Sequence, residues 1–528
     1  MEMSKKEGAP RPLYSSAPIL PEKAEPAPTL WQALPRRRVW LAALAASYAA
    51  GWFYVRALAL GSEQDQWAWA AFPVLFVAGV EAFARALGRR GAGGAPFWAV
   101  CWLLQGAAML LYGLHSELAL WQLLAWHLTA VYWVLARTGM QAAGRANAML
   151  AADGIAGLFT LPWSDIALRT RILAGALGAW RRGRAQRRTP QARRRRQELA
   201  AGILLALALG GYALAELSAA DTAFGAFIGR WLRWPQLSDR QFARLVGDIF
   251  TLLLSLPVGA WLFGLVGGAL RRTRPPLAEG DVYRALGRAP RLPALTGQLA
   301  VGGLCAVYAL FFAVQAAEFL PALGAPLAPQ QVSRFAVEGF WQLCRILLLD
   351  FAVLAAVHFF GARPADAPGR QRAGLCVFGA FGLAFAALAA AKLGLYIHLY
   401  GLTPRRVLSA WVLGMLGLGC VLALVRLFRR IPAVRVLAAA LALSFSLLCC
   451  ADIERACLRD HLARLETGRA ETVDWDLVGN FAYMRGDLAE EAARALKGME
   501  LAPSDAARLA GEPWAEGVPA GQPQSSRG

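Results

Sequence analysis

The stretch AGLCVFGAFGLAFAALAAAKLGLY, residues 373–396, decides the fold class of this chain. Its only charged side chain is that of Lys392. A helix of about 20 apolar residues crosses the roughly 30 Å hydrocarbon core of a bilayer. Backbone groups in lipid must be paired within a helix or a closed barrel, and the mixture of bulky and small residues favours a helix. We therefore predict that residues 373–396 form a transmembrane helix.

Ten further segments share this composition. Hydrophobic residues make up 57% of the 528 residues, charged residues make up 17%, and the mean hydropathy is +0.41. In soluble domains, hydrophobic residues average about 45–50% and charged residues about 25%. This composition therefore excludes a chain made of several soluble domains. The predicted fold class is all-α, a polytopic transmembrane helix bundle of about eleven spans. The predicted spans are 39–60, 67–87, 96–114, 118–136, 199–217, 245–270, 299–320, 343–361, 373–396, 407–428 and 432–450.

The net charge of +20 is distributed asymmetrically along this pattern. If the N-terminus is cytoplasmic, the inner segments carry 34 Lys and Arg residues and the outer loops carry 7. The positive-inside rule then predicts an N-in/C-out topology. The densest basic run, RRGRAQRRTPQARRRR at 181–196, lies in a basic cytoplasmic loop, 137–198. We predict that this run contacts anionic lipids and no nucleic acid.

The segments outside the spans have other compositions. Residues 149–163 include Asp153 and Pro162 and are too few to cross a bilayer, which predicts an interfacial or re-entrant stretch. The Pro-rich residues 1–38 are predicted to be a disordered cytoplasmic N-terminal tail. The transmembrane helical domain is then 39–450.

The C-terminal part has helical periodicity and ordinary charge. Residues 451–500 are predicted to be a helical exoplasmic extension, in which one helix continues from the last span and a helical hairpin then turns at Arg485–Asp487. The hairpin resembles one tetratricopeptide unit. Because a single unit cannot bury its own face, we expect it to pack on the membrane domain, and we consider an envelope protein as its partner. Residues 501–528 are predicted to be a disordered tail.

Ionisable residues inside spans are costly in hydrocarbon and indicate functional sites. With the predicted topology, Asp248, Glu318, Asp350 and Lys392 all fall in the outer half of their spans. An ion pair between Asp350 and Lys392 is one expectation, either as a packing device or as part of a functional pocket.

Three outer loops carry polar motifs at the same face. They read SAADTAFGAF at 218–227, SRFAVEGFWQL at 333–343 and LGLYIHLYGLTPRR at 393–406. In this order they resemble the uncharacterised bacterial membrane family with the domain of unknown function 4153 and its sibling 4173. The resemblance covers roughly residues 195–480 and implies a multi-pass protein of the bacterial cytoplasmic membrane. It is carried by Ala220, Asp221, Phe224, Gln315, Gly339, Phe340, Tyr396, Tyr400, Gly401, Leu402, Thr403 and Arg406.

The topology places these loops at one membrane surface, where they form either one pocket or three separate helix caps. In the first case Asp221 is the natural partner of Arg406. In the second, Thr403 caps a helix that begins at Pro404. The predicted outer-face polar site comprises Asp221, Asp248, Glu318, Gly339, Asp350, Lys392, Tyr400, Thr403 and Arg406.

The sequence contains none of the standard catalytic fingerprints, and no Cys or His spacing predicts a metal or cofactor. We therefore predict no catalytic residue, no cofactor and no metal, and favour a non-enzymatic role. The build indicates a transporter or permease with a polar site at the outer face. Two alternatives remain open: a non-enzymatic envelope scaffold or sensor, and a membrane enzyme that acts on a lipid-linked envelope substrate.

Overall fold

The structure is a computed structural model that describes residues 29–58, 66–186, 190–231, 238–288, 291–322, 339–361 and 369–519. Within these residues the secondary structure is helical and contains no strand. Eleven of the helices are long and apolar enough to cross a membrane, and each contains or closely overlaps one predicted span. The largest differences are at α9 and α11, which begin nine and six residues earlier than predicted. They are α2 (Arg37–Leu58), α3 (Ala68–Ala86), α4 (Ala95–Tyr112), α5 (Ala119–Thr138), α9 (Pro190–Ala220), α11 (Asp239–Arg271), α13 (Ala294–Ala322), α15 (Phe340–Phe360), α16 (Arg370–Tyr400), α17 (Pro404–Phe428) and α18 (Ala433–Cys450).

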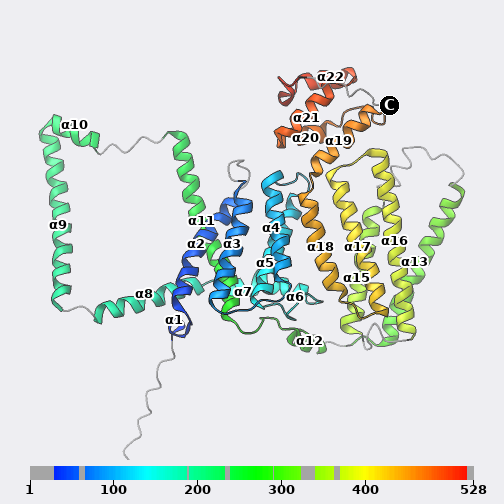
Figure 1. The fold of residues 1–528 in the computed structure, drawn as a ribbon, viewed down its shortest axis with the longest axis horizontal. Helices are drawn as coiled ribbons and strands as arrows, with labels where there is room; N and C mark the ends of the chain where they lie inside the picture. Colours follow the sequence, from blue (N-terminus) through cyan, green and yellow to red (C-terminus); the bar gives the residue numbers. More distant parts are fainter. Residues whose placement is uncertain are drawn as a thin grey trace, which may run out of the picture.

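The first helical bundle consists of α2, α3, α4, α5 and α11 (Figure 1). Its core is rich in tryptophan, and Trp40, Trp102, Trp126 and Trp133 are almost completely buried. Trp102 stacks on Trp133 with ring centroids 5.9 Å apart. Large rigid rings of this kind fill the space between helices with little loss of side-chain entropy.

The second bundle consists of α13, α15, α16 and α17 (Figure 1). The most buried side chains of its core are those of Leu347, Phe378, Phe385 and Ala389. Helix α18 packs against both α4 and α17 and so joins the two bundles. Helix α9 is different, because none of its most apolar stretch is buried, and Figure 1 shows it apart from both bundles.

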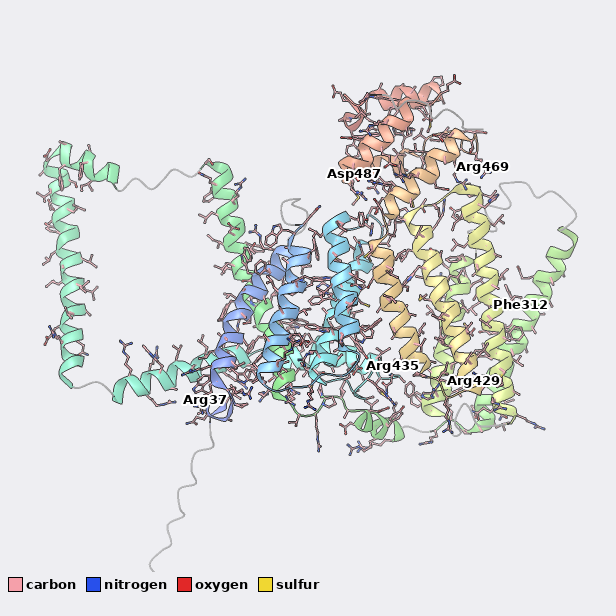
Figure 2. All side chains as sticks on the ribbon, in the orientation of Figure 1. Arg37, Phe312, Arg429, Arg435, Arg469 and Asp487 are labelled. Carbon is pink, nitrogen blue, oxygen red and sulfur yellow. The ribbon has the colours of Figure 1, made fainter. Side chains whose placement is uncertain are left out.

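The helix ends define two faces of the molecule. We call the end where α2 begins and where Arg429 and Arg435 lie the basic face (Figure 2). This face also carries α1 (Leu30–Ala33), α8 (Leu168–Gln186) and α12 (Glu279–Gly287). We call the opposite end, which carries the C-terminal helices and Asp487, the extension face. The α10 helix (Thr222–Trp231) also lies there.

The predicted interfacial or re-entrant stretch is a bent helical segment on the basic face. It consists of α6 (Leu150–Ile155), a π-helical turn (Ala156–Thr160) and α7 (Leu161–Ser164). A Cβ at Gly157 would meet Val131, and one at Gly264 would meet the Pro162 carbonyl. Val131 and Gly264 each lie seven residues from the basic end of their helix, a depth of about 10 Å. The segment therefore packs against α5 and α11 about two helical turns from their basic ends.

The C-terminal extension is a small helical domain. It comprises α19 (Ile453–Glu466), α20 (Trp475–Met484), α21 (Gly486–Lys497), α22 (Pro503–Ala510) and a 3₁₀ turn (Pro513–Ala515). Leu402, just before α17, and Leu408 in its first turns pack against the core of this domain, so it packs on the membrane domain as expected. The predicted hairpin turn at Arg485 is also present.

Three predictions about the polar segments need correction. The last span does not continue into α19, because the Asp452 side chain accepts a hydrogen bond from the Arg455 amide and starts a new helix. Residues 501–519 are folded, since Asp505 accepts hydrogen bonds from the Val473 amide and the Trp475 indole, both at 2.9 Å. Part of the predicted N-terminal tail forms α1. Residues 1–28 and 520–528 lie outside the described residues.

Candidate functional site

The Tyr-Gly-Leu-Thr motif joins α16 to α17 at the extension face. Gly401 has a φ of +79°, a left-handed conformation that glycine adopts without strain. A Cβ there would lie 2.8 Å from an Asp460 carboxylate oxygen, so the close approach of α19 also requires glycine. Thr403 then caps α17 by accepting a hydrogen bond of 3.4 Å from the Arg406 amide, which confirms the predicted cap.

The extension binds the end of α16 through Arg464. Its guanidinium donates hydrogen bonds to the carbonyls of Ile397, His398 and Leu399, at 3.0, 2.7 and 3.2 Å. The last carbonyls of a helix have no partner within the helix and attract positive charge. Asp460 completes the contact by accepting a hydrogen bond of 2.7 Å from the Leu402 amide. The motif therefore serves as a docking element for the extension.

A second contact links the extension to the first bundle. His115, in the loop between α4 and α5, is buried, and its Nδ1 lies 2.5 Å from a Glu454 carboxylate oxygen. Its Nε2 lies 3.1 Å from the Cys449 carbonyl oxygen. Because acceptors face both ring nitrogens, the doubly protonated imidazolium satisfies both contacts. Burial alone lowers the pKa of His115, but the hydrogen bond and charge of Glu454 outweigh it and raise this pKa above its usual value.

A third contact is a charge cluster at the start of α19. Arg485 donates two hydrogen bonds, of 2.6 and 3.1 Å, to the Asp452 carboxylate and lies over the Tyr112 ring. Arg485 also pairs with Asp487 at 2.6 Å and holds the pKa of that carboxyl below its usual value. Planar two-point contacts of this kind fix orientation as well as distance. Asp452, Arg485 and Asp487 all belong to the extension, so this cluster contacts the membrane domain through Arg485 over Tyr112. Two polar contacts and this cation–π contact therefore hold the extension around one apolar core. We call this set of contacts the extension junction.

The other polar site lies inside the second bundle. Asp350 of α15 is 3% exposed, and its Oδ1 accepts a hydrogen bond of 2.7 Å from the Tyr308 hydroxyl of α13. Its Oδ2 has no hydrogen-bond partner among the described residues. A Cβ placed on Gly382 would lie 3.5 Å from this oxygen and 3.4 Å from the Cys420 sulfur. Asp350 is thus a buried carboxyl group with one oxygen facing a small space.

The predicted ion pair between Asp350 and Lys392 is not formed in the described part of the chain. Asp350 is level with Gly382, whereas Lys392 lies ten residues further along α16, a rise of about 15 Å. The Lys392 amine instead extends toward Gly339, where an added Cβ would lie 3.4 Å away. The two residues are separated by this difference along the helices, and the Lys392 side chain extends further toward the end of its span, as long basic side chains do.

Polar groups also lie between Asp350 and the extension face. Gln315 of α13 has a buried side-chain oxygen with no partner among the described residues. It lies seven residues beyond Tyr308 toward the extension face, about 10 Å along the helix. Together with Lys392 it places polar atoms at two levels above Asp350. No group of three His, Cys, Asp or Glu side chains converges as a metal site in the described ranges.

The predicted pocket between Asp221 and Arg406 is not supported. Asp221 caps α10 by accepting a hydrogen bond of 2.9 Å from the Ala223 amide. Arg406 donates to the carbonyls of Tyr400 and Gly401, at 2.8 and 2.5 Å. Helices α10 and α17 are also drawn on opposite sides of the molecule in Figure 1. These two loops each satisfy their own helix end, which is the alternative that the sequence left open. Residues 333–338 of the third loop lie outside the described residues.

The remaining residues of the predicted outer-face site whose side chains are described do not converge on one pocket either. Asp248 of α11 pairs with Arg56 of α2 at 3.0 Å, and its side chain is 63% exposed. Glu318 belongs to α13, but its side chain lies outside the described residues. Tyr400 ends α16 and its ring centroid lies 5.2 Å from that of Tyr396. The structure brings neither Asp248 nor Tyr400 to Asp350.

Sequence reasoning missed several residues of both polar sites. Tyr308 looked like one aromatic residue in an apolar span, and no spacing linked it to Asp350. His115 and Glu454 are separated by 339 positions, so only the packed structure joins them. Asp460 and Arg464 are four residues apart on one helix, a spacing that suggests a local pair. That pair could have indicated from the sequence that this helix carries polar residues of the extension junction.

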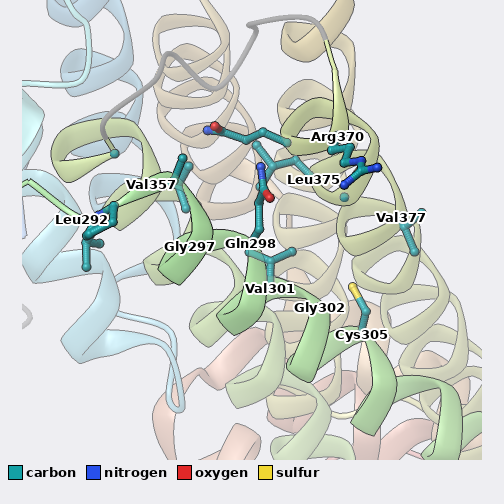
Figure 3. Close-up of a pocket in the computed structure, with 15 residues that line it drawn as sticks. Leu292, Gly297, Gln298, Val301, Gly302, Cys305, Val357, Arg370, Leu375 and Val377 are labelled. Carbon is teal, nitrogen blue, oxygen red and sulfur yellow. The ribbon is translucent and has the colours of Figure 1, made fainter.

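A cavity of about 290 Å³ lies at the basic end of the second bundle (Figure 3). Its walls come from α13, the end of α15 and the start of α16. In Figure 3, Gln298 and Arg370 lie toward one end of the cavity and Cys305 lies at the other. The cavity therefore has a polar mouth and an apolar interior.

Comparisons with known proteins agree with the sequence resemblance. The family model for the domain of unknown function DUF4153 matches residues 92–498. The match is wider than the predicted 195–480, because it also includes α4 and α5. No curated protein and no solved structure matches the chain. The protein is a multi-pass membrane protein, and it belongs to the family defined by the domain of unknown function DUF4153.

Proposed function

We propose that the protein is a membrane transporter in which Asp350 binds the translocated or coupling cation, a proton included. One observation carries this proposal. A carboxyl group that is 3% exposed lies in the middle of a span with only a hydroxyl group as its partner among the described residues. Such a group is expensive in hydrocarbon unless it carries a proton or binds a cation, and intramembrane carboxyl groups therefore mark ion pathways.

The surroundings of Asp350 support cation binding. Tyr308 fixes Oδ1 and leaves Oδ2 directed toward the space beside Gly382. Gln315 offers a further oxygen closer to the extension face. The polar site proposed here therefore lies in the interior of the second bundle, and not at the outer surface where the sequence predicted it. It also favours access from the extension face, because Gln315 and Lys392 both lie on that side.

The proposal is tested by reconstituting the full chain in liposomes on a solid support and recording charge movement after jumps in H⁺, Na⁺ or K⁺ concentration. We expect a current for at least one of these cations. Asp350→Asn keeps the shape of the side chain but removes the charge, so it should abolish the current. Tyr308→Phe should reduce it, because the carboxyl group loses its orienting hydrogen bond.

The matched control is Asp281→Asn, which makes the same replacement at an exposed position of α12, where Asp281 pairs with Arg284. This variant should conduct like the wild type. A wild type that gives no current with any of the three cations would contradict the proposal. So would an Asp350→Asn variant with an undiminished current.

We further propose that the basic face is cytoplasmic, that the extension is exoplasmic and that the membrane is the bacterial cytoplasmic membrane. The distribution of Lys and Arg supports this orientation. It also places the run 181–196 beside anionic lipids. Reporter fusions after residues 160 and 280 should indicate the cytoplasm, and one after residue 470 should indicate the outside. An exoplasmic signal at 280 would contradict the topology.

A second role, binding an envelope partner, has one supporting observation. Tyr483 and Met484 lie next to each other at the end of α20 and are 68% and 47% exposed. A photo-crosslinking residue at Met484 should form a discrete adduct in cells, whereas one at the exposed Arg469 should not. Equal labelling at both positions would argue against a partner at this surface.

A further inference from the structure

The cavity at the basic end of the second bundle has the composition of a lipid site. Its volume is about 290 Å³, and Val301, Val357 and Leu375 are among the side chains of its walls. Gly297, Gly302 and Gly374 also line it, and a Cβ at any of the three would meet no atom within 4 Å. The cavity therefore exists because small residues on α13 and α16 leave space that apolar neighbours do not fill.

The mouth of the cavity is polar and positively charged. Arg370 is exposed there and Gln298 extends toward the same end (Figure 3). The start of α16 contributes as well, because Gly369 provides no side-chain cap and the first amides of a helix carry partial positive charge. Arg370 and the first amides of α16 both lie at the basic end of this helix, at the level expected for lipid headgroups.

We propose that this cavity binds one anionic phospholipid, with an acyl chain between α13 and α16 and the phosphate at Arg370. The apolar walls match an acyl chain and exclude a small hydrophilic anion as a sufficient ligand. The positive mouth distinguishes an anionic headgroup from a zwitterionic one. This site is separate from the basic run 181–196, and it does not depend on a role for Asp350.

The test measures lipid binding to the purified full chain by native mass spectrometry, with thermal unfolding as a second readout. The probes are phosphatidylglycerol, phosphatidylcholine and soluble glycerol phosphate. We expect phosphatidylglycerol to bind more tightly than phosphatidylcholine and to raise the unfolding temperature. Glycerol phosphate should neither bind nor compete, because it has no acyl chain.

Two matched pairs of variants locate the site. Gly302→Leu fills the cavity and should weaken phosphatidylglycerol binding about tenfold or more, since each excluded methylene group costs roughly a factor of four. Gly303→Leu is its control, because Gly303 also has open space but does not line the cavity. Arg370→Gln should weaken binding about fivefold, the effect of one basic side chain at an anionic surface. Arg372→Gln is its control, because Arg372 lies over the Phe428 ring and does not line the cavity.

Three results would overturn the proposal. Equal binding of the two phospholipids would indicate non-selective lipid contact. Binding of glycerol phosphate as tight as that of the phospholipid would indicate a simple anion site. Unchanged phosphatidylglycerol binding by a folded Gly302→Leu variant would show that the lipid lies elsewhere. The ion-jump currents are a separate readout, so failure here leaves the proposal for Asp350 standing.

Discussion

The extension junction and the Asp350 site are both polar, but they differ in the partners that they give to carboxylate groups. At the extension junction, Asp452 and Asp460 each have an arginine partner, Arg485 and Arg464 respectively. In the second bundle, Asp350 has one hydroxyl donor and one oxygen without a partner among the described residues. The extension junction lies at the end of the helices, whereas Asp350 lies inside a span.

On the proposed function, this difference separates structural charge at the extension junction from functional charge at Asp350. Charge-assisted hydrogen bonds at a helix end satisfy groups that would otherwise lack partners, so they stabilise a particular docking geometry. A buried carboxyl group with an incomplete set of partners stabilises nothing by itself, and a ligand or a proton is needed to complete it. Four predictions test this separation.

The largest expected effect is at Arg464. Arg464→Ala removes the donor to three carbonyl groups and leaves Asp460 without its cation, a loss of about 3 kcal/mol or more in the stability of the docked extension. Limited proteolysis of the purified chain should then release the extension much faster than in the wild type. Arg469→Ala, at an exposed position nearby, is the control and should not change the cleavage rate. Equal rates for both variants would show that the extension junction does not hold the extension.

Gly401→Ala should have the next largest effect. The left-handed backbone disfavours alanine by about 1–3 kcal/mol, and the new Cβ would also press against Asp460. Gly394→Ala is the matched control on α16, because its Cβ would meet nothing within 4 Å and alanine favours a helix by about 0.5–1 kcal/mol. The unfolding temperature should fall for the first variant and stay or rise for the second. A fall of equal size in both would contradict the geometry of the motif.

The contact of His115 with Glu454 predicts a smaller, pH-dependent effect. Because the folded-state pKa of His115 is raised, its contribution is present below the ordinary histidine pKa and is lost as the pH rises through the raised value. Asp452 adds negative charge from the same helix start. Proteolytic release of the extension should therefore accelerate from pH 6 to pH 9, and His115→Gln should remove that acceleration.

His461 provides the control for this pH dependence. Its Nε2 accepts a hydrogen bond of 3.0 Å from the Asp474 amide, and burial lowers its pKa. His461→Gln should therefore leave the alkaline acceleration unchanged. An unchanged pH profile in His115→Gln would mean that another group controls it.

The smallest expected effect on stability is at Asp350. Asp350→Asn replaces one oxygen that lacks a partner and retains the acceptor for Tyr308, so the unfolding temperature should shift by no more than the equivalent of about 1 kcal/mol. Asp452→Asn, the same replacement at the extension junction, should be clearly more destabilising because Arg485 loses its two-point partner. The reverse order would show that Asp350 is a structural residue.

Parts of both sites were readable from the sequence because their physics is local. The Thr403 cap depends on residues three positions apart, and a helix start can be recognised from such a spacing. The Asp350 prediction was half correct, since burial in a span follows from composition. The predicted partner was wrong because Lys392 lies about 15 Å further along its helix than the level of Asp350, a relative depth that span boundaries read from the sequence do not fix. The sequence also gives no rotation about the helix axis, and rotation decides that Tyr308 faces Asp350.

The sequence by itself determined the eleven spans and the asymmetry of basic residues between their ends, since both depend on hydrophobicity and charge counted along the chain. It also determined the family through motifs in continuous segments. Only the tertiary structure decided what these motifs do. Gly401 meets Asp460, and His115 meets Glu454, because helices far apart in the chain pack side by side. Such contacts depend on how the apolar surfaces of distant helices pack in three dimensions. No short segment of the sequence specifies that packing.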